Sequence, residues 1–356
     1  MIKYNKNYKK LKSYEFGKQP NNLNILKLNA NENPYKPSLE LIKNLLKEIK
    51  FFGNIMKYYP DPDSINIKRI ISKYYNIKHN EIFLGNGSDE VLAHTFLLFF
   101  KNKKKLYIQD ITYSFYESYI KLYKIKYFIL KLSKNFTIKE KYLKNIIGNI
   151  LITNPNAPTG KLINSIKLEK IILNNKKSII LIDEAYNDFN KEKSTINFIK
   201  KYNNLLICKT LSKSRSLAGL RLGFIIGDKK NITNLNKIKN SFNTYPINIL
   251  TQKILISLYK NNKEFIKKLN IINKNKKFLI KNLKKMKFEI TNSKSNFLFL
   301  KNKNINSNII IKKMKKNNIF IRKFEIPKIE NFLRITIGNK TNCKKILKII
   351  KKIIKK

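Results

Sequence analysis

Short apolar segments of strand length recur along this chain, and helix-forming segments separate several of them. We expect seven such strands, at residues 82–84, 106–109, 127–130, 150–153, 179–182, 205–208 and 224–226. Apolar strands that alternate with helices, such as the one expected at 163–173, are typical of a mostly parallel sheet with helices on both faces. The pattern therefore predicts an α/β fold whose large domain holds a mostly parallel seven-stranded sheet between helices.

A second, smaller α/β pattern follows a long helical stretch at residues 247–287. We expect its strands at 297–300, 319–324 and 333–337, a helix that ends near residue 316, and a last helix at 344–356. The change of pattern predicts a small α/β domain after the large one. We divide the chain into an N-terminal arm at 1–30, a small domain at 31–55 and 270–356, and a large domain at 56–269.

The composition indicates a folded protein without a nucleic-acid partner. The chain has 356 residues, of which 42% are hydrophobic, and this is enough for a sizeable core. Its formal charge of +54 is spread through every segment and forms no single patch or tail, so we expect no nucleic acid as partner. In the last helix, Ile346, Ile350 and Ile353 recur at helical spacing. We expect them to pack on the small domain; binding to a membrane surface is the alternative.

Arginine is rare in this lysine-rich chain, which makes each arginine informative. There are five: Arg69, Arg215, Arg221, Arg322 and Arg334. Because lysine already supplies a plain positive charge, a remaining arginine indicates a need for its planar fork, which binds a carboxylate or phosphate through two hydrogen bonds. Arg322 and Arg334 each interrupt an apolar strand, which is costly unless they meet an anion. We expect them to bind a substrate anion from neighbouring strands; structural ion pairs are the alternative.

Cysteine and histidine are also scarce. Two cysteines, Cys208 and Cys343, form no disulfide framework, which favours a reducing compartment. The two histidines and two cysteines have no metal-ligand spacing, so we expect no metal site. The N-terminus is polar and lacks the apolar region of a signal peptide. These features predict a soluble, cytoplasmic protein that binds no membrane.

The segment TLSKSRSLAGLRLG carries the first candidate site residues. Lys213 lies between two serines, after the expected strand at 205–208, and Arg221 follows between two glycines. A lysine that leaves a buried strand among the hydroxyls of Thr210 and Ser212 suits a phosphate-bearing aldehyde: the amine can form a Schiff base, while hydroxyls and the guanidinium hold the phosphate. A polar loop with one of many lysines is the alternative.

Asp183 ends another apolar strand and is followed closely by Tyr186. Functional groups of parallel sheets collect at the carboxyl ends of the strands. A carboxylate there can pair with a protonated pyridine nitrogen, and the phenol of Tyr186 can reach the oxygen of the same ring. The alternative is an aspartate that caps a helix or lies on the surface.

Three further motifs follow expected strands. GNGSDE places two glycines before Ser88, Asp89 and Glu90 at a helix start, where backbone N–H groups favour a phosphate; an ordinary turn with a serine cap is the alternative. Tyr113, in DITYSFY, can stack on a planar ring or belong to the core. NPNAPTG, at 154–160, is typical of a rigid turn.

The motifs LNANENPY, YYPDPD, GNGSDE, TYSFY, NPNAPTG, LIDEAY, TLSKSRSLAGLRLGF, IFIR and FLRITIG, in this order, resemble those of the histidinol-phosphate aminotransferases across nearly the whole chain. That family belongs to the fold type I enzymes that use pyridoxal 5'-phosphate. The resemblance implies a homodimer and a reversible amino transfer between L-histidinol phosphate and 2-oxoglutarate, which gives imidazole-acetol phosphate and glutamate in histidine biosynthesis.

The resemblance also implies roles for individual residues. The catalytic residues would be Lys213, Asp183 and Tyr186. The residues expected at the cofactor are Tyr59, Ser88, Asp89, Glu90, Tyr113, Asn156, Asp183, Tyr186, Thr210, Ser212, Lys213 and Arg221. Those expected at the substrate are Tyr14, Asn31, Arg322 and Arg334. Tyr59 and Tyr14 would reach the site of the partner subunit.

The chain departs from the family pattern at two places. Ala157 occupies a position that is often an asparagine bonded to the ring oxygen, so either Tyr186 makes that contact alone or Asn156 shifts toward it. TYSFY lacks the prolines that usually precede it. An aromatic-amino-acid aminotransferase and a phosphothreonine decarboxylase are the alternatives of the same fold, and a basic nucleic-acid-binding protein is the alternative of another class.

Overall fold

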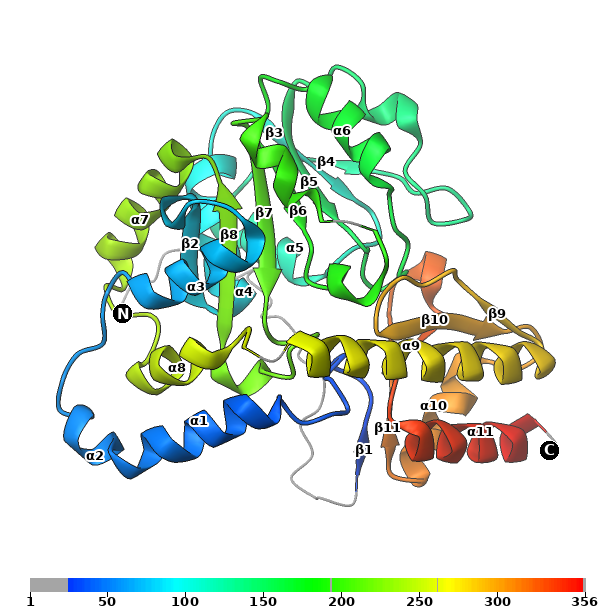
Figure 1. Ribbon diagram of the computed structural model, residues 1–356. Helices are drawn as coiled ribbons and strands as arrows, with labels where there is room; N and C mark the ends of the chain where they lie inside the picture. The colour runs from blue at the N-terminus through cyan, green and yellow to red at the C-terminus, as the bar shows by residue number, and fades with distance from the viewer. Residues whose placement is uncertain (1–24, 193, 261, 355–356) are drawn as a thin grey trace, which may run out of the picture.

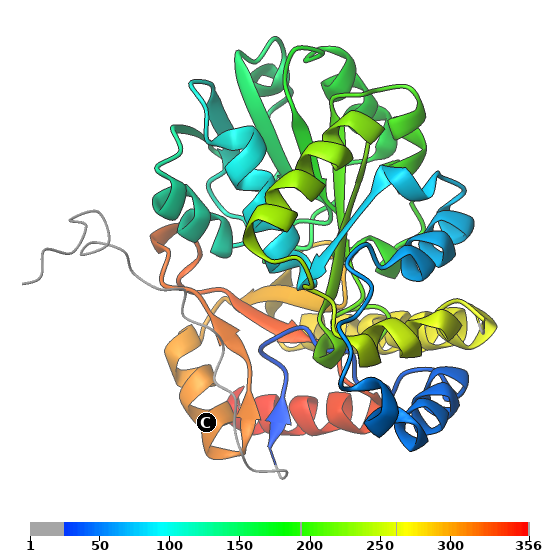
Figure 2. The same ribbon diagram turned by 90° about the vertical axis from the view of Figure 1, so that its left-hand side faces the viewer.

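The structure, a computed structural model, describes residues 25–192, 194–260 and 262–354. A large α/β domain lies above a smaller lobe drawn in orange and red, and the long helix α9 (Asn262–Lys285) packs in the core of this lobe, with β9 (Phe288–Ile290) and β10 (Phe297–Asn302) above it and α11 (Lys340–Ile354) below it in the view (Figure 1). A quarter turn shows the same two layers from the side (Figure 2). Residues of the large domain and of the small lobe together line one cleft.

The large domain is built on a seven-stranded sheet with the order β2-β8-β7-β6-β5-β3-β4. Its strands are β2 (Ile82–Asn86), β3 (Lys105–Gln109), β4 (Tyr127–Leu130), β5 (Gly148–Thr153), β6 (Ile180–Asp183), β7 (Leu205–Thr210) and β8 (Leu222–Gly227). Strand β8 is antiparallel to its neighbours β2 and β7, and the other pairs are parallel. The predicted strands and the mostly parallel sheet are confirmed.

Alternate residues of the central strands enter two separate apolar cores. In β5, Ile150 and Ile152 pack in one core and Leu151 packs in the other, because successive side chains of a strand point to opposite faces. Helices cover both faces: α3 (Ile65–Tyr75) and α6 (Ser165–Leu173) on the first, and α4 (Gly87–Thr95), α5 (Phe115–Tyr123) and α7 (Lys229–Phe242) on the second. Because helices cover both faces of the sheet, the side chains on both faces of each central strand are buried, and this explains why these strands are apolar at successive positions.

The helical stretch expected at 247–287 is divided. Helix α8 (Ile249–Ile254) ends in a short 3-10 turn, and α9 starts only at Asn262. Helix α1 (Leu39–Lys50) packs against α8, where Asn44 Nδ2 donates to two backbone oxygens of α8 at 3.1 Å each. The segment before the long helix therefore contacts α1 as a separate element.

The small lobe has a four-stranded antiparallel sheet with the order β12-β13-β10-β9. Its elements are β9 (Phe288–Ile290), β10 (Phe297–Asn302), β12 (Arg322–Lys323), β13 (Leu333–Thr336), α10 (Ser307–Lys316) and α11 (Lys340–Ile354). A separate parallel pair joins β1 (Leu26–Lys27) to β11 (Ile319–Phe320). The division into an arm and two domains at the predicted residues remains a prediction.

The expectation of one strand at 319–324 is wrong. The segment forms β11 and β12, which belong to different sheets and meet at Ile321. Strand β11 pairs with β1, some 290 residues earlier in the chain (319 − 26 = 293), and β12 pairs with β13. The segment contains no glycine or proline that would mark a break, so only the distant partners reveal it.

The last helix packs on the small lobe, as predicted. Ile346, Ile350 and Ile353 are buried in one core with strands β10 and β13. This amphipathic packing accounts for the isoleucine spacing. Within the described part of the chain, no helix combines the length and apolar character that a membrane span requires.

One buried lysine gives the lobe a pH-dependent stability. Lys276 on α9 is buried, and its ammonium donates to Ser295 O at 2.8 Å. Burial, together with the nearby charge of Lys294, lowers the pKa of Lys276 to about 8. Between pH 8 and 10.5 the unfolded chain keeps this proton and the folded chain has lost it, so a rise in pH favours the folded state.

We therefore predict that the free energy of unfolding of the wild type rises by about 2–3 kcal/mol relative to Lys276→Met between pH 8 and 10.5. Urea unfolding at several pH values measures this difference. Lys281→Met, an exposed change on the same helix, is the control and should track the wild type. An equal pH dependence in wild type and Lys276→Met would contradict the assignment.

Candidate active site

A cleft opens at the carboxyl ends of β6 and β7, beside the start of α4. It consists of a cavity of about 370 Å³ and an adjoining cavity of about 270 Å³. The two cavities share Ala30, Asp89, Tyr113, Ala157, Tyr186 and Lys213 as lining residues. We therefore treat them as one active-site cleft. Its first part holds most of the predicted cofactor residues, and its second part holds Asn31 and two predicted arginines.

Lys213 lies in the loop after β7 and lines both parts of the cleft. Its ammonium donates to Ala30 O at 3.0 Å. Asn33 Nδ2 donates to the backbone oxygens of Lys213 and Ser214 at 3.2 and 3.0 Å, which ties the loop to the segment that follows β1. The lysine is thus held at the cleft by residues far apart in the chain.

Behind this loop lies a buried ionic cluster that the sequence analysis missed. Lys209 Nζ is 3.1 Å from Glu184 Oε2 and 3.7 Å from Asp188 Oδ1. Ser214, next to Lys213, donates to Asp188 Oδ2 at 2.5 Å. Burial alone would raise the pKa of Asp188, but Lys209 and Ser214 hold it below its usual value. The cluster keeps its charges and anchors the loop that carries Lys213.

Asp183 is the last residue of β6, and its carboxylate lines the cleft. Tyr116 OH donates to Oδ2 at 2.6 Å, and the backbone N–H of Ala185 donates to Oδ1 at 2.9 Å. Burial raises the pKa of Asp183, although these two bonds favour the ionised form. Among the described residues, no lysine or arginine forms an ion pair with it, so the carboxylate is suited to a cation that enters the cleft.

Tyr116 was not predicted as a site residue. It is fully buried on α5, and its hydroxyl also lies 3.0 Å from Thr153 Oγ1. Tyr113 lies just before α5 and Tyr116 in its first turn, and their rings pack edge to face with the centroids 5.3 Å apart. The i, i+3 spacing from Tyr113 was therefore the available sequence signal. Tyr116 positions the Asp183 carboxylate and does not itself line the cleft.

The start of α4 and a neighbouring arginine form the other end of the first cavity. Ser88, Thr210, Ser212 and Arg221 line it. Arg221 Nη2 lies 3.2 Å from Asp89 Oδ2, and Tyr113 OH donates to Asp89 Oδ1 at 3.3 Å. Hydroxyls, a guanidinium and a helix N-terminus together form a site suited to a phosphate.

Two glycines allow this close approach. Gly87 has φ +84°, and a Cβ there would lie 2.5 Å from Arg221 Nη2. A Cβ on Gly223 would lie 2.3 Å from the backbone nitrogen of Ser88. A side chain at Gly87 would therefore be strained by the positive φ and would displace the Arg221 guanidinium, whereas one at Gly223 would push β8 away from the helix start.

Tyr186 and Asn31 contact each other in the cleft. Asn31 Nδ2 donates to Tyr186 OH at 2.9 Å, and Thr336 Oγ1 donates to Asn31 Oδ1 at 3.2 Å. The Tyr186 ring packs edge-on against Phe297, with the ring centroids 5.1 Å apart. The phenol oxygen is therefore fixed between the strand ends of the large domain and the small lobe.

Arg322 and Arg334 lie opposite each other on β12 and β13 and line the second part of the cleft. Their predicted place on neighbouring strands is confirmed. Arg334 Nη2 donates to Asn29 O at 2.7 Å, and its guanidinium carbon lies 5.4 Å from the centre of the Phe297 ring. Two guanidinium groups thus face the cleft from the small lobe, next to Tyr113 and Lys213.

Three predicted site residues do not line the cleft, and a fourth lies outside the described residues. Glu90 accepts a hydrogen bond from the backbone N–H of Asn86 and does not line the cleft, so it caps its own helix. Asn156 also lies off the cleft: its Nδ2 donates to Ile111 O at 2.8 Å and to Thr159 Oγ1 at 3.0 Å, so it has not shifted toward the position of Ala157. Tyr59 is exposed and stacks on Tyr245. Tyr14 lies outside the described residues.

The fold and the cleft together define an α/β enzyme with a large domain and a small lobe, and with a lysine, an acid and an anion site at the strand ends. The family model for aminotransferase class I and II matches residues 24–350. The chain is 42% identical, over the full length of both chains, to a histidinol-phosphate aminotransferase of Clostridium botulinum (strain Okra / Type B1). The chain therefore belongs to the aminotransferase class I and II family.

Solved structures agree with this assignment. The histidinol-phosphate aminotransferase of Clostridium acetobutylicum is 26% identical, with a TM-score of 0.83 over 93% of this chain and 99% of that one. A histidinol-phosphate aminotransferase of Sinorhizobium meliloti, solved in complex with pyridoxal-5'-phosphate, has the same fold at 15% identity, with a TM-score of 0.82 over 93% and 91% of the two chains. The predicted fold type I architecture is confirmed.

Two aspartates near the cleft should respond in opposite ways to neutralisation. Asp183 has a raised pKa, so its ionised form costs stability above that pKa; Asp188 has a lowered pKa, so its ionised form stabilises the fold. In the ligand-free protein at pH 7, we predict that Asp183→Asn raises the free energy of unfolding by about 1–3 kcal/mol. Asp188→Asn should lower it by a similar amount.

Urea unfolding of both variants at pH 7 and pH 4 measures these changes. The gain of Asp183→Asn should shrink at pH 4, where the wild-type carboxyl becomes protonated. Most of the loss of Asp188→Asn should persist at pH 4, because the lowered pKa of the wild-type group lies below its ordinary value and the carboxyl is still ionised there. Destabilisation by Asp183→Asn at pH 7 would contradict the conclusion that burial without a counter-charge makes the ionised Asp183 costly.

Proposed function

We propose that this aminotransferase is a histidinol-phosphate aminotransferase, which transfers an amino group reversibly between L-histidinol phosphate and 2-oxoglutarate in histidine biosynthesis. The observation that carries the proposal is the cleft itself, in which Lys213 and Asp183 line one cavity and Arg322 and Arg334 line its extension. The names of relatives that match the whole chain, one of them 42% identical, support the same activity.

The residues of the cleft fit pyridoxal 5'-phosphate as cofactor. The buried Asp183 carboxylate suits the protonated pyridine nitrogen, because burial raises its pKa and no ion pair with a described residue neutralises it. The polar groups at the start of α4 suit the phosphate. When bound, the cofactor supplies an aldehyde that takes up the substrate amine and a ring that withdraws electrons from the substrate α-carbon.

Asp183 and its neighbours would fix the ring and its charge. Tyr116 and the Ala185 N–H orient the carboxylate, which would hold a proton on the pyridine nitrogen of the bound cofactor. The phenol of Tyr186, itself bonded to Asn31, would donate to the ring oxygen in place of the asparagine that Ala157 replaces. Tyr113 would cover the ring face.

Ser88, Thr210, Ser212 and Arg221 would hold the cofactor phosphate. Asp89 would act through Arg221, because it binds the guanidinium directly and fixes its direction. An arginine held by one carboxylate keeps donors for a phosphate, since its fork carries five N–H groups. Glu90 would contribute only by capping the helix that supplies the backbone N–H groups.

Lys213 would move the proton of the reaction. Its ammonium already lies at the junction of the two cavities, held by Ala30 O. From that place the amine, once neutral, can take the proton from the substrate α-carbon and return it to the neighbouring carbon. Arg322 on β12 and Arg334 on β13 line the adjoining cavity, so the small lobe forms one wall of the cleft in which this transfer would occur.

Arg322 and Arg334 would bind the anionic end of each substrate in turn. The phosphate of histidinol phosphate and the carboxylate of glutamate or 2-oxoglutarate both match a planar guanidinium fork. The stacking of Arg334 near Phe297 fixes the plane of that fork. One site can thus serve both half-reactions, which a two-step exchange of the amino group requires.

A homodimer is part of the proposal. Large apolar side chains are exposed along α1 and the segment after it: Leu39, Leu46, Ile49, Phe51, Met56, Tyr58 and Tyr59. A contiguous exposed apolar surface favours association with a second copy. Tyr59 and Tyr14 would then reach the partner's cofactor phosphate and substrate. We propose a cytoplasmic enzyme with no nucleic-acid or membrane partner.

The substrate class is tested with the purified protein saturated with pyridoxal 5'-phosphate. Mixed with histidinol phosphate and 2-oxoglutarate, it should form glutamate, whereas phenylalanine should be a poorer donor and phosphothreonine should release no carbon dioxide. Lys213→Ala should lower the rate at least 1,000-fold and change the cofactor absorbance. Lys281→Ala, an exposed control, should have neither effect.

Absence of glutamate with cofactor bound would reject the substrate. Faster turnover of phenylalanine would favour an aromatic-amino-acid aminotransferase, and release of carbon dioxide would favour the decarboxylase. Salt-dependent retention on DNA without cofactor absorbance would favour a nucleic-acid-binding protein.

The substitution Arg334→Lys tests whether substrate binding needs the planar guanidinium fork of Arg334 or only its positive charge. The variant keeps the positive charge but loses the second hydrogen bond, so kcat/KM for histidinol phosphate should fall about 10- to 100-fold. Steady-state kinetics measure the change, and the cofactor absorbance should stay as in the wild type. Arg69→Lys, an exposed change on α3, is the matched control. Unchanged kcat/KM in Arg334→Lys would show that a single positive charge is sufficient at this position and would contradict the need for a guanidinium fork.

A further inference from the structure

An ion pair joins the large domain to the small lobe beside the active-site cleft. Lys328, in the 3-10 turn Pro327–Ile329 between β12 and β13, donates to Asp110 Oδ2 at 3.0 Å and to Leu132 O at 2.7 Å. Asp110 Oδ1 also accepts a hydrogen bond from the backbone N–H of Leu132 at 3.0 Å. The turn that connects the strands of the two cleft arginines is therefore bonded to two groups of the large domain.

An apolar cluster fills the contact next to this ion pair. Ile111 and Leu132 of the large domain pack with Phe299 and Ile329 of the small lobe, and all four side chains are at most 5% exposed. The ring of Phe136, in the loop after β4, lies edge-on to that of Phe299, with the centroids 5.6 Å apart. The ion pair thus lies beside a packed interface, because its two members adjoin Ile111 and Ile329 in the sequence.

Both sides of this interface continue into the second part of the cleft. On the large-domain side, residues 112–114 follow Ile111 and line the cavity of about 270 Å³. On the small-lobe side, Phe324 packs against the cluster and lines the same cavity, and the guanidinium carbon of Arg334 lies 5.8 Å from the centre of its ring. The interface therefore sets the distance between Tyr113 on one wall and the arginines on the other.

We propose that Asp110 and Lys328 are positioning residues for substrate binding. Their ion pair holds the small lobe where Arg322 and Arg334 reach the anionic end of the substrate. This role rests on the proposed function, because it requires that the two arginines bind substrate. An exposed ion pair would contribute little, but the Asp110 side chain is only 20% exposed, and Lys328 makes a second bond to a backbone oxygen.

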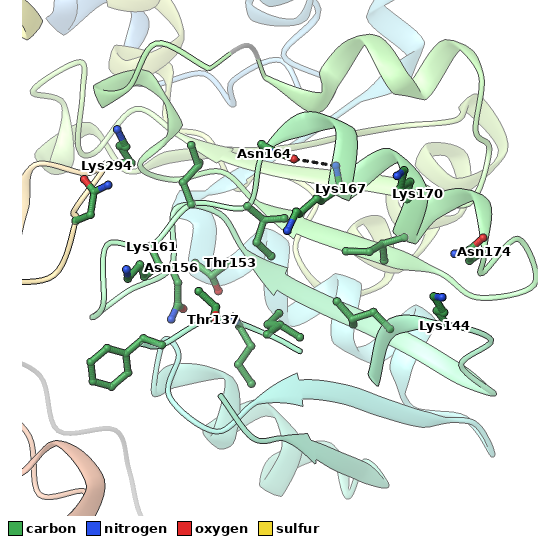
Figure 3. Close-up of a pocket in the computed structure, with 18 residues that line it drawn as sticks. Thr137, Lys144, Thr153, Asn156, Lys161, Asn164, Lys167, Lys170, Asn174 and Lys294 are labelled. Carbon is green, nitrogen blue, oxygen red and sulfur yellow. Dashed lines mark hydrogen bonds between the residues drawn. The ribbon is translucent and has the colours of Figure 1, made fainter. Parts of the chain in front are cut away.

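A second contact keeps the small lobe attached when the ion pair is removed. The backbone oxygens of Thr159 and Gly160 accept hydrogen bonds from Thr291 Oγ1 at 2.6 Å and from the Lys294 N–H at 2.8 Å. This contact borders a pocket of about 410 Å³ beside α6, which Lys161 of the large domain and Lys294 of the small lobe both line (Figure 3). Because neither this contact nor the apolar cluster includes the ion pair, we expect its variants to fold.

Asp110→Asn and Lys328→Met test the proposal in the protein saturated with pyridoxal 5'-phosphate. The first keeps the bond from Leu132 N–H but removes the charge, and the second removes both bonds of the ammonium. Each should raise KM for histidinol phosphate and for 2-oxoglutarate about three- to tenfold, with kcat within about twofold of the wild type. In calorimetry, the dissociation constant of glutarate, which has no keto group to react, should rise by the same factor. Lys328→Arg should keep the wild-type values.

Hydrogen exchange of the backbone amides at 110–114 and 324–332 gives a readout that needs no substrate. Exchange should be faster in Asp110→Asn and Lys328→Met than in the wild type. Glu289→Gln, which removes an ion pair with Lys301 inside the small lobe, is the matched control and should change neither exchange nor KM.

The outcomes separate this role from the proposed function. Faster exchange with unchanged KM and glutarate affinity would overturn the positioning role, and unchanged exchange in both variants would show that the ion pair does not hold the interface. An inactive wild type would instead reject the proposed function itself, and with it a substrate role for the pair.

Discussion

The site depends on one buried carboxylate at the end of a strand. Asp183 ends β6 inside a sheet covered on both faces, where an ionised group is costly unless bonds and a counter-charge compensate. Tyr116 and the Ala185 N–H supply the bonds. The counter-charge is left to a molecule in the cleft. The Asp183 carboxylate therefore gives the first cavity a preference for a cationic ring. A cavity lined only by apolar side chains would have no such preference.

Glu184, the residue after Asp183, is in contrast paired with a positive charge of the protein itself. Glu184 points away from the cleft, where it pairs with Lys209 and accepts hydrogen bonds from the backbone N–H and the hydroxyl of Thr195. Two adjacent acids therefore have different uses, because successive residues at a strand end face opposite sides of the sheet. One is available to a ligand, and the other anchors the loop of Lys213 through Asp188 and Ser214.

Much of this was predictable from the sequence, since strand ends and glycine turns leave local signals. The strands, the positions of Lys213 and Asp183 and the pairing of Arg322 with Arg334 needed only local pattern and the rule that sites collect at strand ends. Tyr116, on α5, was missed because its partner Asp183 lies 67 residues away, at the end of β6. The break at Ile321 was missed for the same reason, since the partner of β11 is near the N-terminus. Asn156 has a suitable side chain, but its amide is already bonded to Ile111 and Thr159, which no local pattern shows. The roles of Tyr14 and Tyr59 remain predictions.

The most direct test of the central claim is a crystal structure of the protein grown with pyridoxal 5'-phosphate. The account predicts one ring in the first cavity, with its pyridine nitrogen at hydrogen-bond distance from Asp183. The amine of Lys213 should lie at bonding distance from the aldehyde carbon, and the phosphate should lie beside Ser88 and Arg221. A cofactor bound outside this cavity, or a ring that turns its phosphate toward Asp183, would contradict the account.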